Sequence, residues 1–114
     1  MDSRHDVLVS PLPAAVEVAA FRIATEALTN AARHAHATRC RIELDHEDRA
    51  LSVIIRDNGI GLPAGYTPGV GTTSMRARAV ELGGVFFTGT DPSGGTVVSA
   101  SLPLINHTAE ESPR

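Results

Sequence analysis

The sequence of 114 residues contains no lysine and no tryptophan, and its aromatic content is only 4%. All ten basic residues are arginine, which excludes a Schiff-base lysine and a Walker A phosphate loop, because both depend on a lysine amine. The shortage of aromatic side chains argues against a surface on which nucleic-acid bases stack. With a net charge of −3, the chain has no electrostatic basis for binding a polyanion, so we expect no nucleic-acid partner.

Cysteine is represented by Cys40 alone. A single cysteine allows neither an internal disulfide nor a cysteine-rich metal site, and it is typical of a reducing compartment. No apolar run approaches the roughly 20 residues of a membrane-spanning helix, and no secretory leader is recognisable. We therefore expect a cytoplasmic domain without direct membrane contact. If it serves a membrane-bound receptor, the membrane part lies outside this chain.

The length is that of one domain, and two of its segments have helical patterns. Residues 72–82 predict a helix with a threonine or serine as N-cap and Gly83–Gly84 as its stop. A longer helix is expected from residue 14 to about residue 36, where glycine and proline are absent. Its apolar residues recur at steps of three and four and would form one face, which consists of Val16, Ala20, Ile23, Ala27 and Ala31.

Five short strands are expected, at residues 5–10, 39–45, 51–57, 85–88 and 96–102. A turn at residues 47–49 joins the second and third strands as a hairpin. Alternation places two sets of side chains on the inner side of these two strands: Cys40, Ile42 and Leu44, and Leu51, Val53 and Ile55. The predicted fold class is α+β. It is a two-layer α/β sandwich, with a mixed, mostly antiparallel sheet of about five strands and helices on one face.

The long helix carries Glu26, Asn30 and Arg33 at spacings of four and three, which place them on one face. A carboxylate and a carboxamide one turn apart can serve a hydrated Mg²⁺, because the amide oxygen is a hard ligand and Mg²⁺ takes other ligands from water and phosphates. The alternative is an amphipathic helix whose polar groups are simply solvated.

Residues 57–61 (DNGIG) close an apolar strand and open a loop rich in glycine and proline. A carboxylate at a strand end can accept a hydrogen bond from an exocyclic amino group, and the glycines let the backbone approach a ligand. The alternative is a hairpin, since Asn-Gly is a strong hairpin signal. However, residues 61–65 (GLPAG) do not suit a returning strand, because proline and glycine are depleted there. The pattern favours a ligand loop.

Two further glycine motifs follow. Residues 69–71 (GVG) lead into the second helix, where free N–H groups and the positive end of the helix dipole suit a phosphate. Residues 94–96 (GGT) bring a hydroxyl into the last strand. Taken singly, the first motif occurs at many helix starts without a ligand, and the second is most often a tight turn.

The order of these motifs resembles the Bergerat-fold (GHKL) ATP-binding domains over about residues 7–104. More narrowly, residues 26–35 (EALTNAARHA) resemble the N box of sensor histidine kinases of the nitrate/nitrite-sensor type. Residues 75–78 (MRAR), followed by residues 82–84 (LGG), are similar to that subfamily as well. The resemblance implies an ATP-binding catalytic domain at 7–104, an N-terminal tail at 1–6 and a polar C-terminal tail at 105–114, all belonging to a longer kinase.

The resemblance also implies roles for single residues. Asn30 would hold Mg²⁺ against the triphosphate, and Asp57 would accept a hydrogen bond from the adenine amino group. Glu26 would polarise the site or accept a proton near the γ-phosphate. His34 would face the phosphates or end the helix as a solvated histidine. The remaining cofactor-binding positions are Gly59 and Gly61 in the base pocket, Gly69, Gly71 and Thr72 on the phosphate side, and Thr96 at the adenine end.

The implied function is to bind MgATP or MgADP and to deliver the γ-phosphoryl to a histidine on a dimerisation and phosphoacceptor domain missing from this chain. A response regulator would act downstream, and the fragment would be a monomer that does not autophosphorylate alone. Three alternatives stay open: a serine kinase of the anti-sigma-factor type, a degenerate domain that only docks partners, and a small α/β domain with chance glycines. Thr72 and Ser74 depart from the subfamily pattern of an apolar and a small residue, and this departure gives weight to the docking-only domain.

Overall fold

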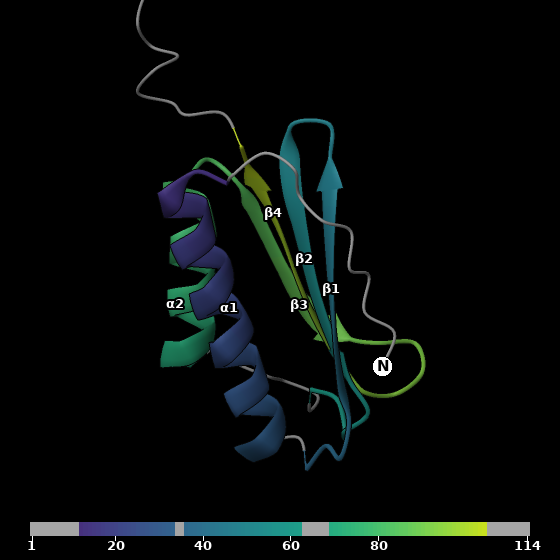
Figure 1. Cartoon of the computed structure of the whole chain (residues 1–114). Helices are drawn as coiled ribbons and strands as arrows, with labels where there is room; N and C mark the ends of the chain where they lie inside the picture. Colours follow the sequence, from purple (N-terminus) through teal and green to yellow (C-terminus); the bar gives the residue numbers. More distant parts are fainter. Residues whose placement is uncertain (1–11, 34–35, 63–68, 105–114) are drawn as a thin grey trace, which may run out of the picture.

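The structure is a computed structural model, and it describes residues 12–33, 36–62 and 69–104. In these ranges, α1 and α2 lie on the same face of an antiparallel sheet, so the molecule has two layers (Figure 1). The elements in chain order are α1 (Ala14–Arg33), β1 (Cys40–Glu47), β2 (Ala50–Asp57), α2 (Val70–Glu81), β3 (Val85–Thr90) and β4 (Thr96–Pro103). The predicted α+β class is confirmed.

The sheet has the strand order β1-β2-β4-β3. Its four strands, all antiparallel, differ from the predicted mixed sheet of about five, and the strand expected at residues 5–10 lies outside the described part of the chain. The β1–β2 hairpin is confirmed, with Glu47 paired to Ala50. Across the centre, inward residues of β2 and β4 face each other in register: Leu51 with Leu102, Val53 with Ala100, and Ile55 with Val98.

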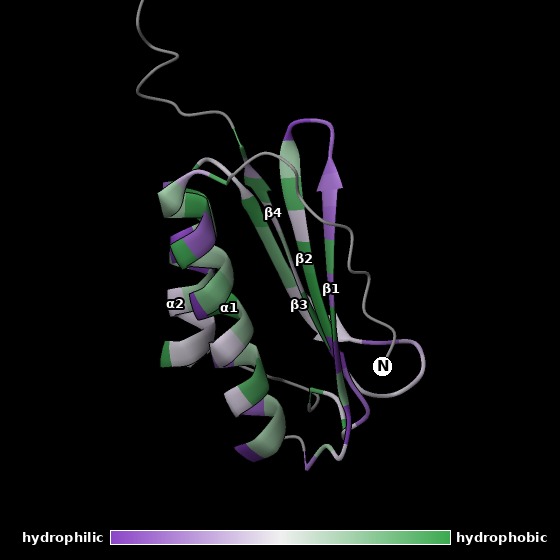
Figure 2. Cartoon of the chain, in the orientation of Figure 1, coloured by the Kyte–Doolittle hydropathy of each residue, from purple (hydrophilic) through white to green (hydrophobic). Residues whose placement is uncertain are grey.

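The core lies between the paired strands β2 and β4 and the inner faces of the two helices. Ile23 of α1 is fully buried at 0% exposure, and Met75 and Ala79 of α2 pack into the same cluster. Figure 2 shows hydrophobic residues along β2 and β4, with a hydrophilic end to the β1–β2 hairpin. The buried stripe of α1 is the predicted one except that Ala19 replaces Ala20, and it consists of Val16, Ala19, Ile23, Ala27 and Ala31.

The edge strand β1 departs from the expected pattern. Cys40 and Ile42 pack partly against the core, but Leu44 is 44% exposed. The helices lie mainly over the other strands, so neither of the two described helices covers the outer half of β1 (Figure 1). Alternation in the sequence identifies the side of a strand but not whether a helix covers that side.

Helix α1 is described to Arg33, next to the undescribed residues 34–35, and His36 has a positive φ of 54°, so the helix ends before residue 36. The start of the second helix differs from prediction. Helix α2 begins two residues early, so its N-cap is Gly69 and the predicted threonine or serine cap is wrong. The predicted stop is confirmed, because the amides of Gly83 and Gly84 donate to carbonyls of the last turn. None of the helices in the described ranges is long and apolar enough to cross a membrane.

Gly84→Ala should destabilise the fold by about 1–3 kcal/mol, because overpacking a closed site costs that much. A Cβ at position 84 would lie 2.1 Å from the carbonyl oxygen of Ser101, which is backbone and cannot swing away. Urea unfolding followed by circular dichroism measures the effect. In the matched control Gly69→Ala nothing lies within 4 Å of the new Cβ, so the cost should stay below about 1 kcal/mol. Equal midpoints for the two variants would contradict this packing.

Candidate functional site

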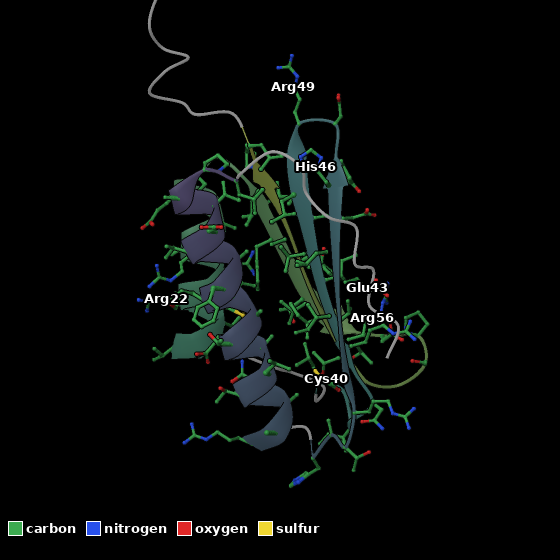
Figure 3. The ribbon with its side chains drawn as sticks, viewed as in Figure 1. Arg22, Cys40, Glu43, His46, Arg49 and Arg56 are labelled. Carbon is green, nitrogen blue, oxygen red and sulfur yellow. The ribbon has the colours of Figure 1, made fainter. Side chains whose placement is uncertain are left out.

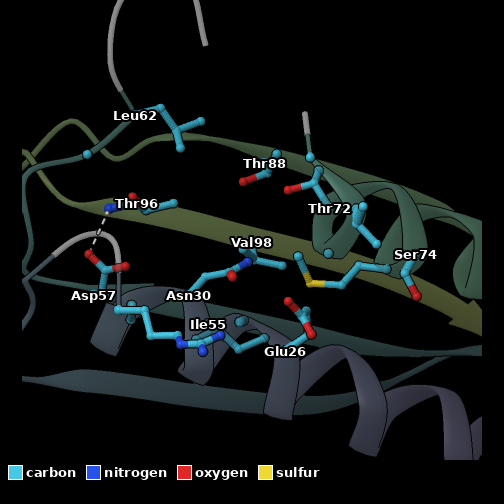
Figure 4. A pocket seen from close by; sticks show the side chains of 18 of the residues that line it. Glu26, Asn30, Ile55, Asp57, Leu62, Thr72, Ser74, Thr88, Thr96 and Val98 are labelled. Atoms are coloured by element: carbon cyan, nitrogen blue, oxygen red, sulfur yellow. Dashed lines mark hydrogen bonds between the residues drawn. The ribbon is translucent and has the colours of Figure 1, made fainter. Parts of the chain in front are cut away.

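A cavity of about 750 Å³ opens between the two helices and the sheet (Figure 4). Its size is typical of a small-molecule site. It collects the predicted site residues from every part of the chain that the structure describes, except Gly59. The predicted residues that line it are Glu26, Asn30, Asp57, Gly61, Gly69, Gly71, Thr72 and Thr96. His34 lies outside the described residues.

The side chain of Asp57, the last residue of β2, is held in place by hydrogen bonds from two backbone amides. Its Oδ1 accepts hydrogen bonds from the amide of Gly59, at 2.8 Å, and from the amide of Thr96, at 3.1 Å (Figure 4). Thr96 therefore holds the carboxylate through its main chain. Gly59 acts in the same way, as an anchor behind the pocket rather than as part of its wall. Because both bonds go to Oδ1, and no described residue bonds Oδ2, one carboxylate oxygen remains for a ligand.

The last strand approaches Asp57 so closely that only glycine fits. A Cβ at Gly95 would lie 1.8 Å from the Asp57 carbonyl oxygen. On the other side, Gly61 has a φ of 79° and lies against the carbonyl oxygen of Gly94, and the amide of Leu62 donates to the Thr90 hydroxyl at 3.2 Å. Residues 57–61 thus lead into a loop that contacts the β3–β4 turn. The described residues 58–62 form a loop and not a returning strand, so the hairpin alternative is wrong; binding of a ligand by this loop stays a prediction.

The loop has a second anchor that the sequence did not reveal. The Asn58 side-chain oxygen accepts from the amides of Thr38 and Arg39, both at 2.9 Å, and so joins the loop to the segment before β1. The contact spans about twenty residues and depends on the β1–β2 pairing. Nothing local to the Asn-Gly pair distinguishes this role from that of an ordinary turn residue.

At the other end of the cavity, the helices meet through Glu26 and Gly71. A Cβ on Gly71 would lie 2.2 Å from Glu26 Oε2, so the carboxylate rests on the first turn of α2. This position is favourable, because the helix N-terminus carries partial positive charge. Asn30 lies one turn along α1, half-buried, and Arg33 also lines the cavity. The predicted shared face of these three residues is confirmed.

The cavity therefore has two different ends. Figure 4 shows Asp57 and Thr96 at one end and Glu26 and Ser74 toward the other. The wall between them is apolar and includes side chains that we had not selected from the sequence, namely Ile55, Met75 and Val98. The sequence pattern places these residues on the inner side of a strand or helix, but it does not distinguish inward residues that line a cavity from inward residues of the core. An apolar wall beside a fixed acceptor suits a flat ring with an amino group.

Metal binding at this site would depend on the ligand. Within residues 12–33, 36–62 and 69–104, no group of three or more His, Cys, Asp or Glu side chains could hold a metal ion. The oxygen donors of Asn30 and Glu26 suit Mg²⁺, which prefers oxygen and completes its shell with water and phosphates. These oxygen donors thus fit a Mg²⁺ ion that binds together with a phosphate ligand.

Cys40 lies opposite Asp57 in the β1–β2 register. Burial, and then the nearby Asp57 charge, raise the pKa of the Cys40 thiol. A thiol with a raised pKa is a poor nucleophile at neutral pH. Cys40 is accordingly a half-buried strand residue with little thiolate character.

Comparison with known proteins decides the family. The chain matches the family model described as histidine kinase-, DNA gyrase B- and HSP90-like ATPase over residues 15–106. The chain belongs to this ATPase family. It is an ATP-binding domain of the histidine-kinase type, which confirms the broad resemblance seen in the sequence.

Curated relatives of this ATPase domain include the sensor protein VraS of Staphylococcus epidermidis and of Staphylococcus saprophyticus, which are 32% and 34% identical to it over 102 residues. The alignments cover 88% of this chain but only 29% of those proteins, so the chain spans less than a third of their length.

Among solved structures, the histidine kinase domain of a blue-light activated histidine kinase from Erythrobacter litoralis has a TM-score of 0.69 and 25% identity, covering 81% of this chain and 46% of that one. The ATP binding domain of PrrB from Mycobacterium tuberculosis has a TM-score of 0.64 and 24% identity, covering 85% and 78%. The second similarity shows a shared fold.

Proposed function

We propose that the chain is the catalytic domain of a sensor histidine kinase of the nitrate/nitrite-sensor type. It binds MgATP and transfers the γ-phosphoryl to a histidine on a helical dimerisation and phosphoacceptor domain. The observation that carries the proposal is one cavity with a backbone-fixed Asp57 at one end and Glu26 against the first turn of α2 toward the other, with Asn30 lining the cavity between them (Figure 4). The domain comprises residues 7–104, and the family match over 15–106 supports this extent.

At the adenine end, Asp57 Oδ2 accepts a hydrogen bond from the exocyclic amino group. Guanine has a carbonyl oxygen at the equivalent ring position, which a fixed carboxylate repels. The ring itself lies against the apolar wall formed by Ile55, Met75 and Val98. Selection of adenine thus rests on one acceptor, the Asp57 carboxylate, which is held in place by hydrogen bonds from two backbone amides.

At the phosphate end, this chain provides donors without a lysine. The N-terminal turn of α2, which Gly69 caps and which contains Gly71, offers backbone amides and the positive end of the helix dipole. Asn30 would hold Mg²⁺, which neutralises phosphate charge when bound. Glu26 lies beside this turn, where it can accept the proton that the attacking imidazole loses as the phosphoryl group transfers. His34 would assist as the last polar residue of the N box.

Thr72 departs from the subfamily pattern, yet it takes a wall position in the site. It is only 5% exposed, in the first turn of α2, and it lines the cavity. Ser74, by contrast, is exposed at the cavity's rim. These positions are compatible with nucleotide binding and give no specific support to a docking-only domain.

The partners follow from the reaction. The phosphoacceptor domain and a response regulator receive the phosphoryl group in turn, and the domain lies at the cytoplasmic end of its sensor as a monomeric unit. Neither nucleic acid nor membrane contacts it directly. The net charge of −3 gives no basis for either contact.

Asp57→Asn should weaken ADP binding by about 1–3 kcal/mol, the usual penalty for a lost or mismatched buried hydrogen bond. The asparagine oxygen can still accept from Gly59 and Thr96, so the Tm should change little, while its NH₂ group opposes the adenine amino group. Calorimetric titration measures the affinity. Asp57→Ala also leaves the amides of Gly59 and Thr96 without their acceptor, so this variant should lower the Tm as well. An ADP affinity that survives Asp57→Asn would refute the adenine assignment.

Asn30→Ala should remove the Mg²⁺ dependence of ATP binding and leave the fold intact, because alanine is a good helix former at this half-buried edge. Titration with a non-hydrolysable ATP analogue, in Mg²⁺ and then in chelator, gives the two affinities. Thr29→Ala is the matched control on the exposed side of α1 and should keep the Mg²⁺ dependence. A Mg²⁺ effect of full size in Asn30→Ala would remove Asn30 from the metal site.

Phosphotransfer tests the proposed reaction itself. Together with the helical domain of its parent protein and ATP, the chain should produce a phosphate that is labile in acid and stable in alkali, as phosphohistidine is. Alone it should produce none. Acid-stable phosphate on a separate protein would indicate the serine-kinase alternative instead.

A further inference from the structure

The β3–β4 turn, residues 91–95, contacts both parts of the adenine end. Gly95 lies against the backbone of Asp57, and the carbonyl oxygen of Gly94 lies where a Cβ on Gly61 would come within 2.8 Å. Immediately after the turn, the Thr96 amide donates to Asp57 Oδ1. The position of this turn therefore determines how the carboxylate and the glycine loop are held.

Asp91 organises the turn through every polar group that it has. Its amide donates to the Gly95 carbonyl at 2.6 Å, and its carbonyl accepts from the Gly94 amide at 2.8 Å. Its Oδ2 accepts from the amide of Ser93 at 3.1 Å and from the Ser93 hydroxyl. Its Oδ1 accepts from Arg56 at 2.8 Å. With 9% exposure, Asp91 is the most strongly anchored residue of the turn.

Arg56 connects the turn to the strand that ends in Asp57. It directly precedes Asp57 on β2, and its side chain lies on the outer face of the sheet beside Glu43 (Figure 3). Since neighbouring residues on a strand point to opposite faces, Arg56 ties the turn from outside while Asp57 faces the cavity. One strand end thus holds the turn by two independent contacts, the Arg56–Asp91 ion pair and the Asp57–Thr96 hydrogen bond.

We propose that Asp91 is a positioning residue for base selection, which ties the β3–β4 turn to Arg56 and thereby fixes the orientation of the Asp57 carboxylate. The inference rests on the proposed adenine-binding role of Asp57. When the turn is loosened, the Thr96 amide withdraws and the Asp57 carboxylate can rotate. A rotating carboxylate loses its preferred angle to adenine and can also accept from the ring N–H and amino groups of guanine, so selectivity falls along with affinity.

The charge of Asp91 persists under physiological conditions. The hydrogen bonds from Ser93, and then the nearby Arg56 guanidinium, hold the pKa of Asp91 below its usual value. The carboxylate is therefore ionised throughout the neutral range, and its bonds to Ser93 and Arg56 are charge-assisted. The positioning contact is permanent near neutral pH and is lost only as the pH falls through this lowered pKa.

The test is calorimetric titration of the wild type and Asp91→Asn with ADP and with GDP, both in Mg²⁺. Asp91→Asn should lower the ratio of ADP to GDP affinity by about tenfold, the effect of losing a hydrogen bond to a charged group. The matched control is Asp48→Asn, the same change in the exposed β1–β2 turn, and it should leave the ratio unchanged. A folded Asp91→Asn with the wild-type ratio would overturn the inference.

A double-mutant comparison separates positioning from general loosening. In an Asp57→Asn background, Asp91→Asn should change ADP affinity no further, because the group through which it acts is gone. An additional loss of the full size would indicate a merely structural role and would overturn the inference. Should Asp91→Asn fail to fold, Ser93→Ala takes its place. It is an exposed residue whose hydroxyl donates to Asp91, and a lower ADP-to-GDP ratio is expected, while an unchanged ratio overturns the inference.

The wild-type titration distinguishes the two proposals. If the wild type binds ADP over GDP and neither Asp91→Asn nor Ser93→Ala alters that preference, only the positioning role fails. If the wild type binds neither nucleotide, or binds both equally, the proposed function fails and the inference fails with it.

Discussion

Two backbone amides converge on one oxygen of Asp57, and much of the site depends on that convergence. The Gly59 amide comes from the loop that follows β2, and the Thr96 amide comes from the first residue of β4. The bonds require β4 to lie against the end of β2, which only a glycine at position 95 permits. The pairing of β2 with β4, the loop after β2 and the orientation of the Asp57 carboxylate therefore depend on one another. Together they fix a hydrogen-bond acceptor beside the apolar wall of the cavity.

The opposite end of the cavity follows a different principle. There the N-terminal turn of α2, capped by Gly69 and containing Gly71, lies against Glu26 of α1, and Asn30 lines the cavity one helical turn further along α1. Backbone amides and a helix dipole replace the lysine that the sequence lacks altogether. The two ends suit the two halves of a nucleotide, since one offers a single directional acceptor and the other a field favourable to negative charge, beside the oxygen atoms proposed to hold Mg²⁺.

Local patterns predicted most of the fold, because α1, the β1–β2 hairpin and the stop of α2 at Gly83 depend on spacing and glycine chemistry. The start of α2 was missed because Gly69 caps it with no polar side chain, whereas a threonine or serine cap was expected, and Thr72 lies buried in the first turn. The exposure of Leu44 was missed because it depends on how far the helices extend over the sheet.

The residues that line the candidate site could be predicted from the sequence, but most of the hydrogen bonds that hold them in place could not. Motif order identified Asp57, Asn30 and the glycines, but not that Thr96 acts through its amide. The Arg56–Asp91 contact joins residues 35 positions apart and exists only once β2 pairs with β4. Such contacts form only in the folded chain, and the local sequence around either residue does not predict them.

Calorimetric titration of the unmodified chain with ADP, in Mg²⁺ and in chelator, with GDP as the comparison, tests nucleotide recognition most directly. We expect ADP to bind, its affinity to rise with Mg²⁺, and GDP to bind far more weakly. Equal affinities for ADP and GDP, or no binding of either, would contradict the reading of this cavity as an adenine-nucleotide site built around Asp57.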